Sequence, residues 1–324
     1  MNVPPAGNRF TLAQLLIVVG ILGAGLGLAV RWMQQAREAA CRSACKNNLK
    51  QHALGFQNHQ DQRGDNVPLA VFSRGFSWAE LSRPYLESRG NFRSRYELPY
   101  DSPSNASELR YLSNYPYLYC PSRRKAPQLT AGFAAGDYAV PSVGVVESNN
   151  SALDDTWLQA HDLSKNKGPF LLVWRTQPRF PIPTNLPGIV VSAGHYRSKT
   201  TMASWTNGAS NQIVLGEKAL HPRRLNTDGK GGDFTIGSWI ENDYNASGCT
   251  RNGGESLARS PWDDPEGMWP RFGSWHEGVC QFAYGDGHVE VVNNYVNSSV
   301  LRQGCDRTSR ARNKAPSDGR EQEP

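Results

Sequence analysis

His276, Asp286 and His288 are of the residue types that do metal chemistry, because imidazole and carboxylate groups are common metal ligands. A β-hairpin over residues 276–292 would bring the first of them near the last. Three ligands aimed at one point do not follow from this pattern, and Asp286 and Gly287 are residues that a tight turn with positive φ requires. We therefore predict that Asp286 and Gly287 form the turn and that His276 hydrogen-bonds to a neighbouring strand or loop. We predict that no metal is bound.

Calcium could find oxygen ligands at Asp286 and Glu290 of the same hairpin, or in the glycine-rich segment 228–233. In that segment Lys230 stands where an oxygen ligand is needed, so a flexible loop is predicted. Acyl-transfer chemistry lacks its Gly-x-Ser-x-Gly motif, and His195 has no nucleophile nearby in the sequence. No phosphate-binding or dinucleotide-binding glycine motif occurs either. We predict a protein that is not an enzyme, with no catalytic residues and no cofactor.

The cysteines could supply thiolate ligands or disulfides. No Cys-x-x-Cys pair occurs and the Cys41–Cys45 spacing has no second pair of ligands, so a zinc site is weakly supported. Disulfides in an oxidising compartment fit the scattered spacing better, and reduced cysteines buried as small hydrophobic side chains are the alternative. The six are Cys41, Cys45, Cys120, Cys249, Cys280 and Cys305.

An apolar segment over residues 10–30 precedes all of these residues, and no charge falls between Arg9 and Arg31. A helix of about 20 apolar residues matches the hydrocarbon thickness of a bilayer. The whole chain is nevertheless polar, with a mean hydropathy of -0.57. A cleaved secretory signal would end in small residues, whereas Arg31 is followed by Trp32 and Met33. A signal anchor and a pilin-like N-terminus are the two better interpretations.

The N-terminal segment resembles that of prepilins, in which Phe-Thr-Leu-x-Glu follows a glycine and precedes an apolar run. Phe10-Thr11-Leu12-Ala13-Gln14 carries the resemblance, with Arg9 at the position of the glycine and Gln14 at that of the glutamate. In prepilins the carboxylate pairs with the N-terminal amine of a neighbouring subunit, and Gln14 has no charge to offer. We expect inefficient cleavage between Arg9 and Phe10. The partners implied are the lipid bilayer, other pilin-like subunits and secretion-system components.

Arg31, Arg37 and Arg42 follow the apolar segment while Arg9 alone precedes it, which by the positive-inside rule would place the bulk of the chain in the cytoplasm. Long domains translocate largely regardless of flanking charge, and cysteine usage and the prepilin resemblance favour the other side. We expect a single-pass protein of the bacterial inner membrane whose C-terminal domain lies in the periplasm or at the cell surface.

Residues 31–60 continue the helical pattern. Cys41, Cys45, Leu49, His52 and Phe56 recur every three or four residues and form one apolar stripe. A single helix from about residue 10 to 58 is predicted, with its second half packed on a globular domain. The predicted layout is a short leader over 1–9, a transmembrane helix over 10–30, its continuation over 31–60, an envelope-exposed α+β domain over 61–305 and a disordered tail over 306–324.

Short apolar runs with turn signals dominate the second half of the chain. The Asp-Gly turn within 279–292 lies between alternating runs and predicts a hairpin, with Val279, Gln281 and Ala283 on the opposite face from Cys280. The predicted fold is α+β and pilin-like, a long helix packed on an antiparallel sheet. Further predicted elements are short helices over 78–86 and near residue 108, and strands over 138–140, 170–174, 189–191 and 213–215.

The basic residues do not indicate a nucleic-acid partner. The net charge is +6, and clusters such as Arg123-Arg124-Lys125 are expected to be solvated surface rather than one patch.

Several blocks of the chain resemble the bacterial family known as domain of unknown function 1559, whose members look like pilins at the N-terminus and carry a Gly-Asp-Gly-type hairpin. Block order and spacing make the resemblance specific, and it implies a membrane-tethered protein of a type II secretion or type IV pilus-like kind. The blocks are residues 10–16, 34–40, 45–51, 56–59, 119–122, 206–211, 214–218, 272–276 and 286–289.

Cys45 and Cys120 both belong to blocks that carry this resemblance, and we predict that they form a disulfide, with Cys41 as the rival partner. The predicted function is that of a membrane-anchored, pseudopilin-like envelope protein with a structural, assembly or surface-tether role. The alternatives are an envelope ligand- or glycan-binding module and, less favoured, a hydrolase.

Overall fold

The structure is a computed structural model of the 324-residue chain. It forms two compact units, Met1–Ser43 and Ala44–Pro324. The residues it describes are 11–62, 64, 66–68, 71–72, 77–86, 115–126, 129–130, 133–144, 166–170, 172–173, 189–192, 195–198, 200–225, 250–263 and 271–310.

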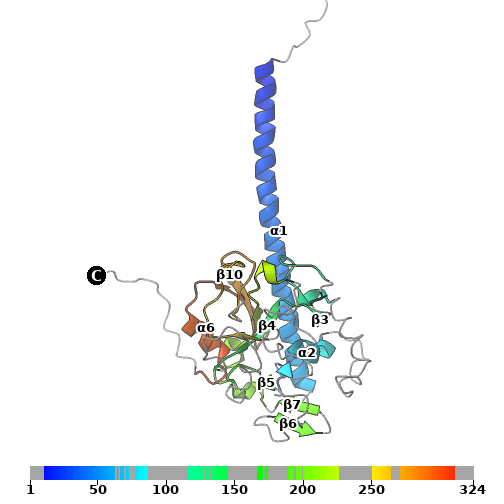
Figure 1. The fold of residues 1–324 in the computed structure, drawn as a ribbon, viewed down its shortest axis with the longest axis vertical. Coiled ribbons are helices and arrows are strands. Elements are labelled where there is room, and N and C mark those ends of the chain that lie inside the picture. The colour runs from blue at the N-terminus through cyan, green and yellow to red at the C-terminus, as the bar shows by residue number, and fades with distance from the viewer. Residues whose placement is uncertain are drawn as a thin grey trace, which may run out of the picture. The chain divides into compact units, whose positions relative to one another are not determined.

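Helix α1 spans Leu12–Gln62 and is continuous over 51 residues (Figure 1). This confirms the single helix predicted from about residue 10 to 58. Its apolar N-terminal part is long and hydrophobic enough to cross a membrane, with a mean hydropathy of 2.3 and none of that window buried. The side chains of this part, from Leu12 to Met33, are exposed.

A reciprocal cap starts α1. The Thr11 amide donates to Gln14 Oε1 over 3.0 Å, and the Gln14 amide donates to Thr11 Oγ1 over 3.4 Å. This is a capping box, which satisfies two of the amides that a helix N-terminus otherwise leaves unpaired. Gln14 therefore acts here as a helix-capping residue. Arg9 and Phe10, the other residues of the predicted processing segment, lie outside the described residues.

The second unit combines short helices with short strands. Its helices are α2 Trp78–Ser82, α6 Ser298–Cys305 and the 3-10 turns η1 Arg83–Tyr85, η4 Pro116–Leu118, η6 Met202–Ser204, η7 Ala209–Asn211 and η8 Pro222–Arg224. Its strands are β1 Val71–Phe72, β2 Leu129–Thr130, β3 Phe133–Ala134, β4 Tyr138–Ser142, β5 Leu172–Val173, β6 Ile189–Ser192, β7 His195–Ser198, β8 Ile213–Glu217, β9 Thr250–Asn252, β10 Val279–Tyr284 and β11 Val289–Asn293.

The central sheet has five strands in the order β11-β10-β8-β4-β9. Strands β11, β10, β8 and β4 pair antiparallel, whereas β9 pairs with β4 in parallel, from Val140 opposite Thr250 to Ser142 opposite Asn252. The α+β class is thus as predicted, but the sheet is mixed rather than antiparallel. The predicted 279–292 hairpin is present as β10 and β11, and Gly287 in its turn has a φ of 89°.

Two hydrophobic cores lie on the sheet. In one, Leu49, Ala53 and Phe56 of α1 pack with Leu215 of β8 and Ala283 of β10. The stripe predicted on the second half of the helix is therefore its buried face.

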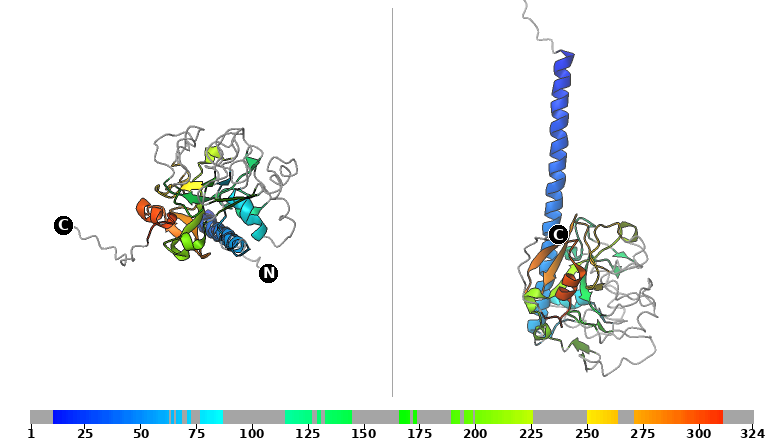
Figure 2. Two further views of the ribbon diagram at one scale, coloured as in Figure 1. Left: turned by 90° about the horizontal axis from the view of Figure 1, so that it is seen from below. Right: turned by 90° about the vertical axis from the view of Figure 1, so that its left-hand side faces the viewer.

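The other core holds Cys280 and Phe282 of β10 together with Leu301 and Cys305 of α6, which packs against β8 (Figure 2). Cys280 and Ala283 thus belong to different cores, as the alternation along the hairpin predicts.

Two local predictions differ from the structure. Of the strand expected over 170–174, Leu172–Val173 is present as β5 and residues 171 and 174 lie outside the described residues, while Phe170 lies in an irregular turn in which the Asn166 side-chain amide donates to its carbonyl oxygen over 2.9 Å. The tail expected from residue 306 begins with ordered backbone, because the Arg307 amide donates to the Lys167 carbonyl oxygen over 2.8 Å.

The helix predicted over 78–86 is present as α2 followed by η1, and the strands predicted over 138–140, 189–191 and 213–215 are present as β4, β6 and β8. Other predictions fall outside the described residues. They are the helix near residue 108, the loop over 228–233, Cys249 and residues 311–324.

Candidate functional site

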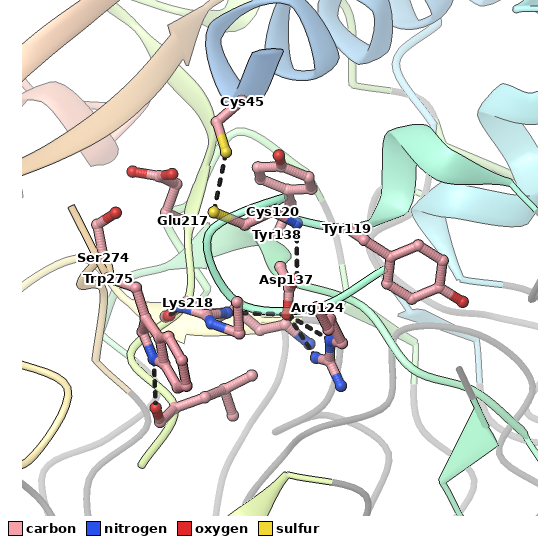
Figure 3. A network of polar contacts seen from close by, with 12 residues as sticks. Cys45, Tyr119, Cys120, Arg124, Asp137, Tyr138, Glu217, Lys218, Ser274 and Trp275 are labelled. Carbon is pink, nitrogen blue, oxygen red and sulfur yellow. Dashed lines mark hydrogen bonds and ion pairs between the residues drawn. The ribbon is translucent and has the colours of Figure 1, made fainter. Parts of the chain in front are cut away.

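Four buried side chains of the second unit converge on one point: Cys45, Cys120, Glu217 and His276, here called the ligand cluster. Figure 3 labels the first three of them. Each offers one metal-binding atom, and these four atoms all lie within 4.8 Å of one another. The two Sγ atoms are 2.9 Å apart, Cys120 Sγ is 3.6 Å from His276 Nε2, and that nitrogen is 3.5 Å from Glu217 Oε1. Each of the four residues is at most 1 % exposed. The arrangement is therefore closed to solvent.

Cys45 and Cys120 are brought together by the packing of α1 on the segment after η4. Cys45 lies on the buried stripe of α1, one turn before Leu49. Asn48, on the same turn, donates to the Tyr119 carbonyl oxygen over 3.0 Å and to the Tyr138 hydroxyl over 3.2 Å. This amide fixes the residue before Cys120 against the helix, so the two thiols face each other.

Glu217 and His276 reach the cluster from the sheet. Glu217 ends β8, and its Oε2 accepts the Gln281 amide of β10 over 2.8 Å. Its Oε1 is left on the side of the cluster and accepts no hydrogen bond from the described residues. His276 lies in the turn before β10, where its amide donates to Ser274 Oγ over 3.1 Å.

A buried ion cluster of Asp137, Arg123 and Arg124 lies next to Cys120; Figure 3 labels Asp137 and Arg124. Asp137 Oδ2 accepts the Cys120 amide over 2.7 Å, while its Oδ1 accepts from Arg123 over 2.9 Å and from Arg124. Arg123 also donates to the Lys218 carbonyl oxygen over 2.7 Å. The expectation that these arginines are solvated surface is wrong, because the buried Asp137 carboxylate needs compensating charge and draws both inward.

The surroundings shift the acidities of the buried groups. The hydrogen bond with Cys45 lowers the pKa of the Cys120 thiol, and His276 and the charge of Arg123 act in the same direction. Burial raises the pKa of Glu217 to about 7, and the negative charge on Cys120 adds to this effect. Burial also opposes ionisation of Asp137, but the charges of Arg124 and Arg123 hold its pKa at about 2. The site thus favours a thiolate at Cys120 and a charged Asp137 beneath it.

The ligand cluster offers two kinds of chemistry. Two thiolates, an imidazole and a carboxylate are a set of four ligands that suits a tetrahedral metal ion. Two neighbouring thiols of unequal acidity are also the components of a disulfide. The four residues are each at most 1 % exposed, so a metal ion held by all four groups would have no open position for a substrate within the described residues.

The chain matches the family model described as protein of unknown function (DUF1559) over residues 34–299, which is most of its length. The chain belongs to this family. No curated protein and no solved structure shows a significant match to it. The whole ligand cluster of this DUF1559 protein lies within the matched residues.

The predicted pairing partners of the DUF1559 protein do meet. Cys45 and Cys120 are neighbours, with their Sγ atoms 2.9 Å apart, but both are free cysteines in this structure, which does not support the predicted disulfide. Cys41 is also free and half-buried, and it belongs to the other unit.

The residues predicted to form the hairpin turn do so. The His288 amide donates to Asp286 Oδ1 over 3.1 Å, and their side chains pair at the surface. His276 contacts a loop residue, Cys120, and a strand residue, Glu217, as expected. These contacts place it in a set of possible metal ligands, which the sequence analysis did not predict.

Glu217 is the member of the cluster that sequence reasoning missed. It stands at the end of the predicted strand 213–215, where an alternating pattern gives no reason to expect a buried carboxylate. The available signal was its place in one block of the family resemblance, directly before Lys218.

Proposed function

We propose that this DUF1559 protein is a membrane-anchored, pseudopilin-like envelope protein with a structural role. Its N-terminal helix spans the inner membrane once, and its α+β domain lies in the periplasm or at the cell surface. It acts as a tether or assembly element and not as an enzyme.

The exposure of the apolar part of α1 carries this proposal. Thirteen large apolar side chains between Leu12 and Met33 are each about half exposed or more, from 49 % at Val18 to 75 % at Leu12. At about 1 kcal/mol for each side chain left in water, their hydration would cost on the order of 10 kcal/mol. That is comparable to the whole stability of a typical domain, about 5–15 kcal/mol. A bilayer removes this cost.

The capping box favours a tether over a filament subunit. Pilin assembly, by the resemblance, uses a carboxylate at the position of Gln14 to pair with a neighbouring N-terminal amine. Here the side chain is neutral, and its oxygen already accepts the Thr11 amide. The chain therefore lacks the charge that would hold such a contact.

Fusion reporters test both the anchor and its orientation. The full chain fused at its C-terminus to alkaline phosphatase should be active and carbonate-resistant in membranes, while a fusion to a cytoplasm-restricted fluorescent protein should be dark. A double variant, Ile21→Arg with Leu22→Arg, should release the chain from membranes, since each arginine at the centre of a span costs about 3 kcal/mol.

Leu54→Arg is the matched control. It places one arginine, half the charge of the double variant, on the same helix at a side chain that is 53 % exposed and outside the apolar segment. This variant should remain in membranes. A wild-type chain found in the soluble fraction would refute the anchor. An inactive phosphatase fusion together with a fluorescent second fusion would refute the orientation.

A further inference from the structure

We propose that one structural zinc ion is bound by Cys45, Cys120, Glu217 and His276. The ion would cross-link the C-terminal part of α1 to the sheet of the α+β domain. The inference concerns the second unit alone and does not depend on how the chain is oriented in a membrane.

The distances in the cluster match a tetrahedral zinc site along two of their edges. Bond lengths of about 2.3 Å to sulfur and about 2.05 Å to nitrogen and oxygen give edges of about 3.6 Å between sulfur and nitrogen and about 3.4 Å between nitrogen and oxygen. The observed values are 3.6 Å from Cys120 Sγ to His276 Nε2 and 3.5 Å from His276 Nε2 to Glu217 Oε1. The two sulfurs, at 2.9 Å, would have to separate to about 3.8 Å around the ion. The four atoms lie within 4.8 Å of one another, so the longer separations would also have to shorten around the ion.

The chemistry of the four groups selects zinc. Two soft thiolates with an imidazole suit zinc, whereas calcium and magnesium prefer sites made only of oxygen. Four protein ligands with at most 1 % exposure leave no position for water, which is the mark of a structural rather than a catalytic site. Metal binding would release the thiol protons to solvent.

A disulfide accounts for only half of the cluster. A Cys45–Cys120 bond would use the two sulfurs and leave Glu217 Oε1 buried, with no hydrogen bond from the described residues and with His276 Nε2 facing it at 3.5 Å. A buried carboxylate oxygen that makes no hydrogen bond is costly, and a divalent cation held between the four groups would remove that cost more fully than a histidine 3.5 Å away. The zinc site uses all four groups at once, so the placement of Glu217 favours it.

The charge beside the site also fits a bound cation with excess anionic ligands. Two thiolates and one carboxylate around a divalent ion carry one net negative charge. Next to them, Arg123 and Arg124 share the single carboxylate of Asp137, which leaves one net positive charge. The two buried groups of charges thus compensate each other. Asp137 also accepts the Cys120 backbone amide, so it holds the backbone of one ligand residue in place, as hydrogen-bond partners of metal ligands commonly do.

The site would join four segments that are far apart in the sequence. Cys45 comes from α1, Cys120 from the segment after η4, Glu217 from the end of β8 and His276 from the turn before β10. Binding an ion that the unfolded chain holds poorly stabilises the folded state by mass action. The domain should therefore lose stability when the ion is removed.

The experiment measures metal content and thiol state on the full chain purified in detergent without chelator. Wild-type protein should carry zinc in close to a one-to-one ratio, and after metal removal and reloading with cobalt it should show thiolate-to-cobalt charge-transfer absorption. Zinc removal should lower its melting temperature, and added zinc should restore it.

Cys120→Ser and Glu217→Gln test the ligands, and Cys305→Ala is the matched control because Cys305 is a buried cysteine of the other core. Each ligand variant should weaken zinc binding by about 100-fold or more, since loss of even an outer-shell partner costs about 10–100-fold. The control should keep its zinc and its cobalt spectrum. Where a ligand variant does not fold, the wild-type metal content and spectrum decide the matter.

Two results would overturn the proposal. One is a wild-type chain without zinc whose intact mass is lower by two hydrogens, with Cys45 and Cys120 joined in one peptide pair, which would show a disulfide. The other is a chain with both thiols free that takes up no zinc or cobalt when either is supplied.

Discussion

Replacement of Asp137 by asparagine should destabilise the domain severely. Its carboxylate is fully buried and is shared by two arginines whose side chains are at most 4 % exposed. Asp137→Asn keeps the shape and removes the charge, so Arg123 and Arg124 stay buried without their counter-ion. Breaking a buried ion pair costs about 3–5 kcal/mol, and two arginines are left here, so we expect at least about 4 kcal/mol. That is a change of roughly a thousandfold in the unfolding equilibrium constant, at about 1.4 kcal/mol per factor of ten.

The assay is denaturant unfolding of the full chain in detergent, followed by the fluorescence of the buried tryptophans, which include Trp78 and Trp205. Asp263→Asn is the matched control, because it removes an aspartate charge from an exposed turn where the carboxylate caps Ser260 and Arg259. The control should lose about 1 kcal/mol or less. If the free energy of unfolding of Asp137→Asn is also within about 1 kcal/mol of the wild-type value, the two arginines do not depend on the carboxylate. The account of the ion cluster would then be wrong.

Three further outcomes are expected. The pKa of Asp137 is held at about 2 in the folded protein against 3.8 normally, so its ionisation stabilises the fold by about 2 kcal/mol above pH 4. The difference in stability between the wild type and Asp137→Asn should therefore shrink as the pH falls from about 5 to 2. A difference that stays constant in pH-dependent melts would refute this. Gly216→Ala should cost about 1–3 kcal/mol in thermal melts, because its Cβ would lie 2.5 Å from the phenylalanine ring of β10, whereas Gly20→Ala, with nothing within 4 Å, should not destabilise the chain. Mass spectrometry of the membrane-purified chain should find residues 1–9 retained in some or all molecules, and a uniform N-methylated Phe10 terminus would contradict this.

The elements that follow a strong local pattern could be predicted from the sequence. The period of the α1 stripe gave its buried face, and the Asp-Gly turn with alternating flanks gave the β10–β11 hairpin and its two faces. In both cases the information lies within a few residues of the element itself. The parallel pairing of β9 with β4 could not be predicted, because it depends on the path of more than a hundred intervening residues.

The ligand cluster shows the same limit more sharply. Metal sites are found in a sequence when their ligands lie close together, as in paired Cys-x-x-Cys motifs. Here each ligand comes from a different segment, so spacing carries no signal. The inward-facing arginines were missed for a related reason. Arg123 and Arg124 resemble a surface cluster until the fold brings the buried Asp137 beside them.

Gln14 shows how one residue can separate two roles for a pilin-like helix. A glutamate at this position could cap the helix in the same way, since a capping box accepts either glutamate or glutamine three residues after the N-cap. Selection for capping alone would therefore not distinguish the two, whereas charge pairing with a neighbouring subunit requires the carboxylate. Gln14→Glu should then leave the cap and the start of α1 intact, because the Thr11 amide still finds its acceptor. If the chain is a tether, the substitution adds a charge and no new assembly. Filaments or stable oligomers formed by Gln14→Glu in the membrane would show that the neutral side chain limits assembly through this helix, and that the rest of the helix surface is competent to assemble.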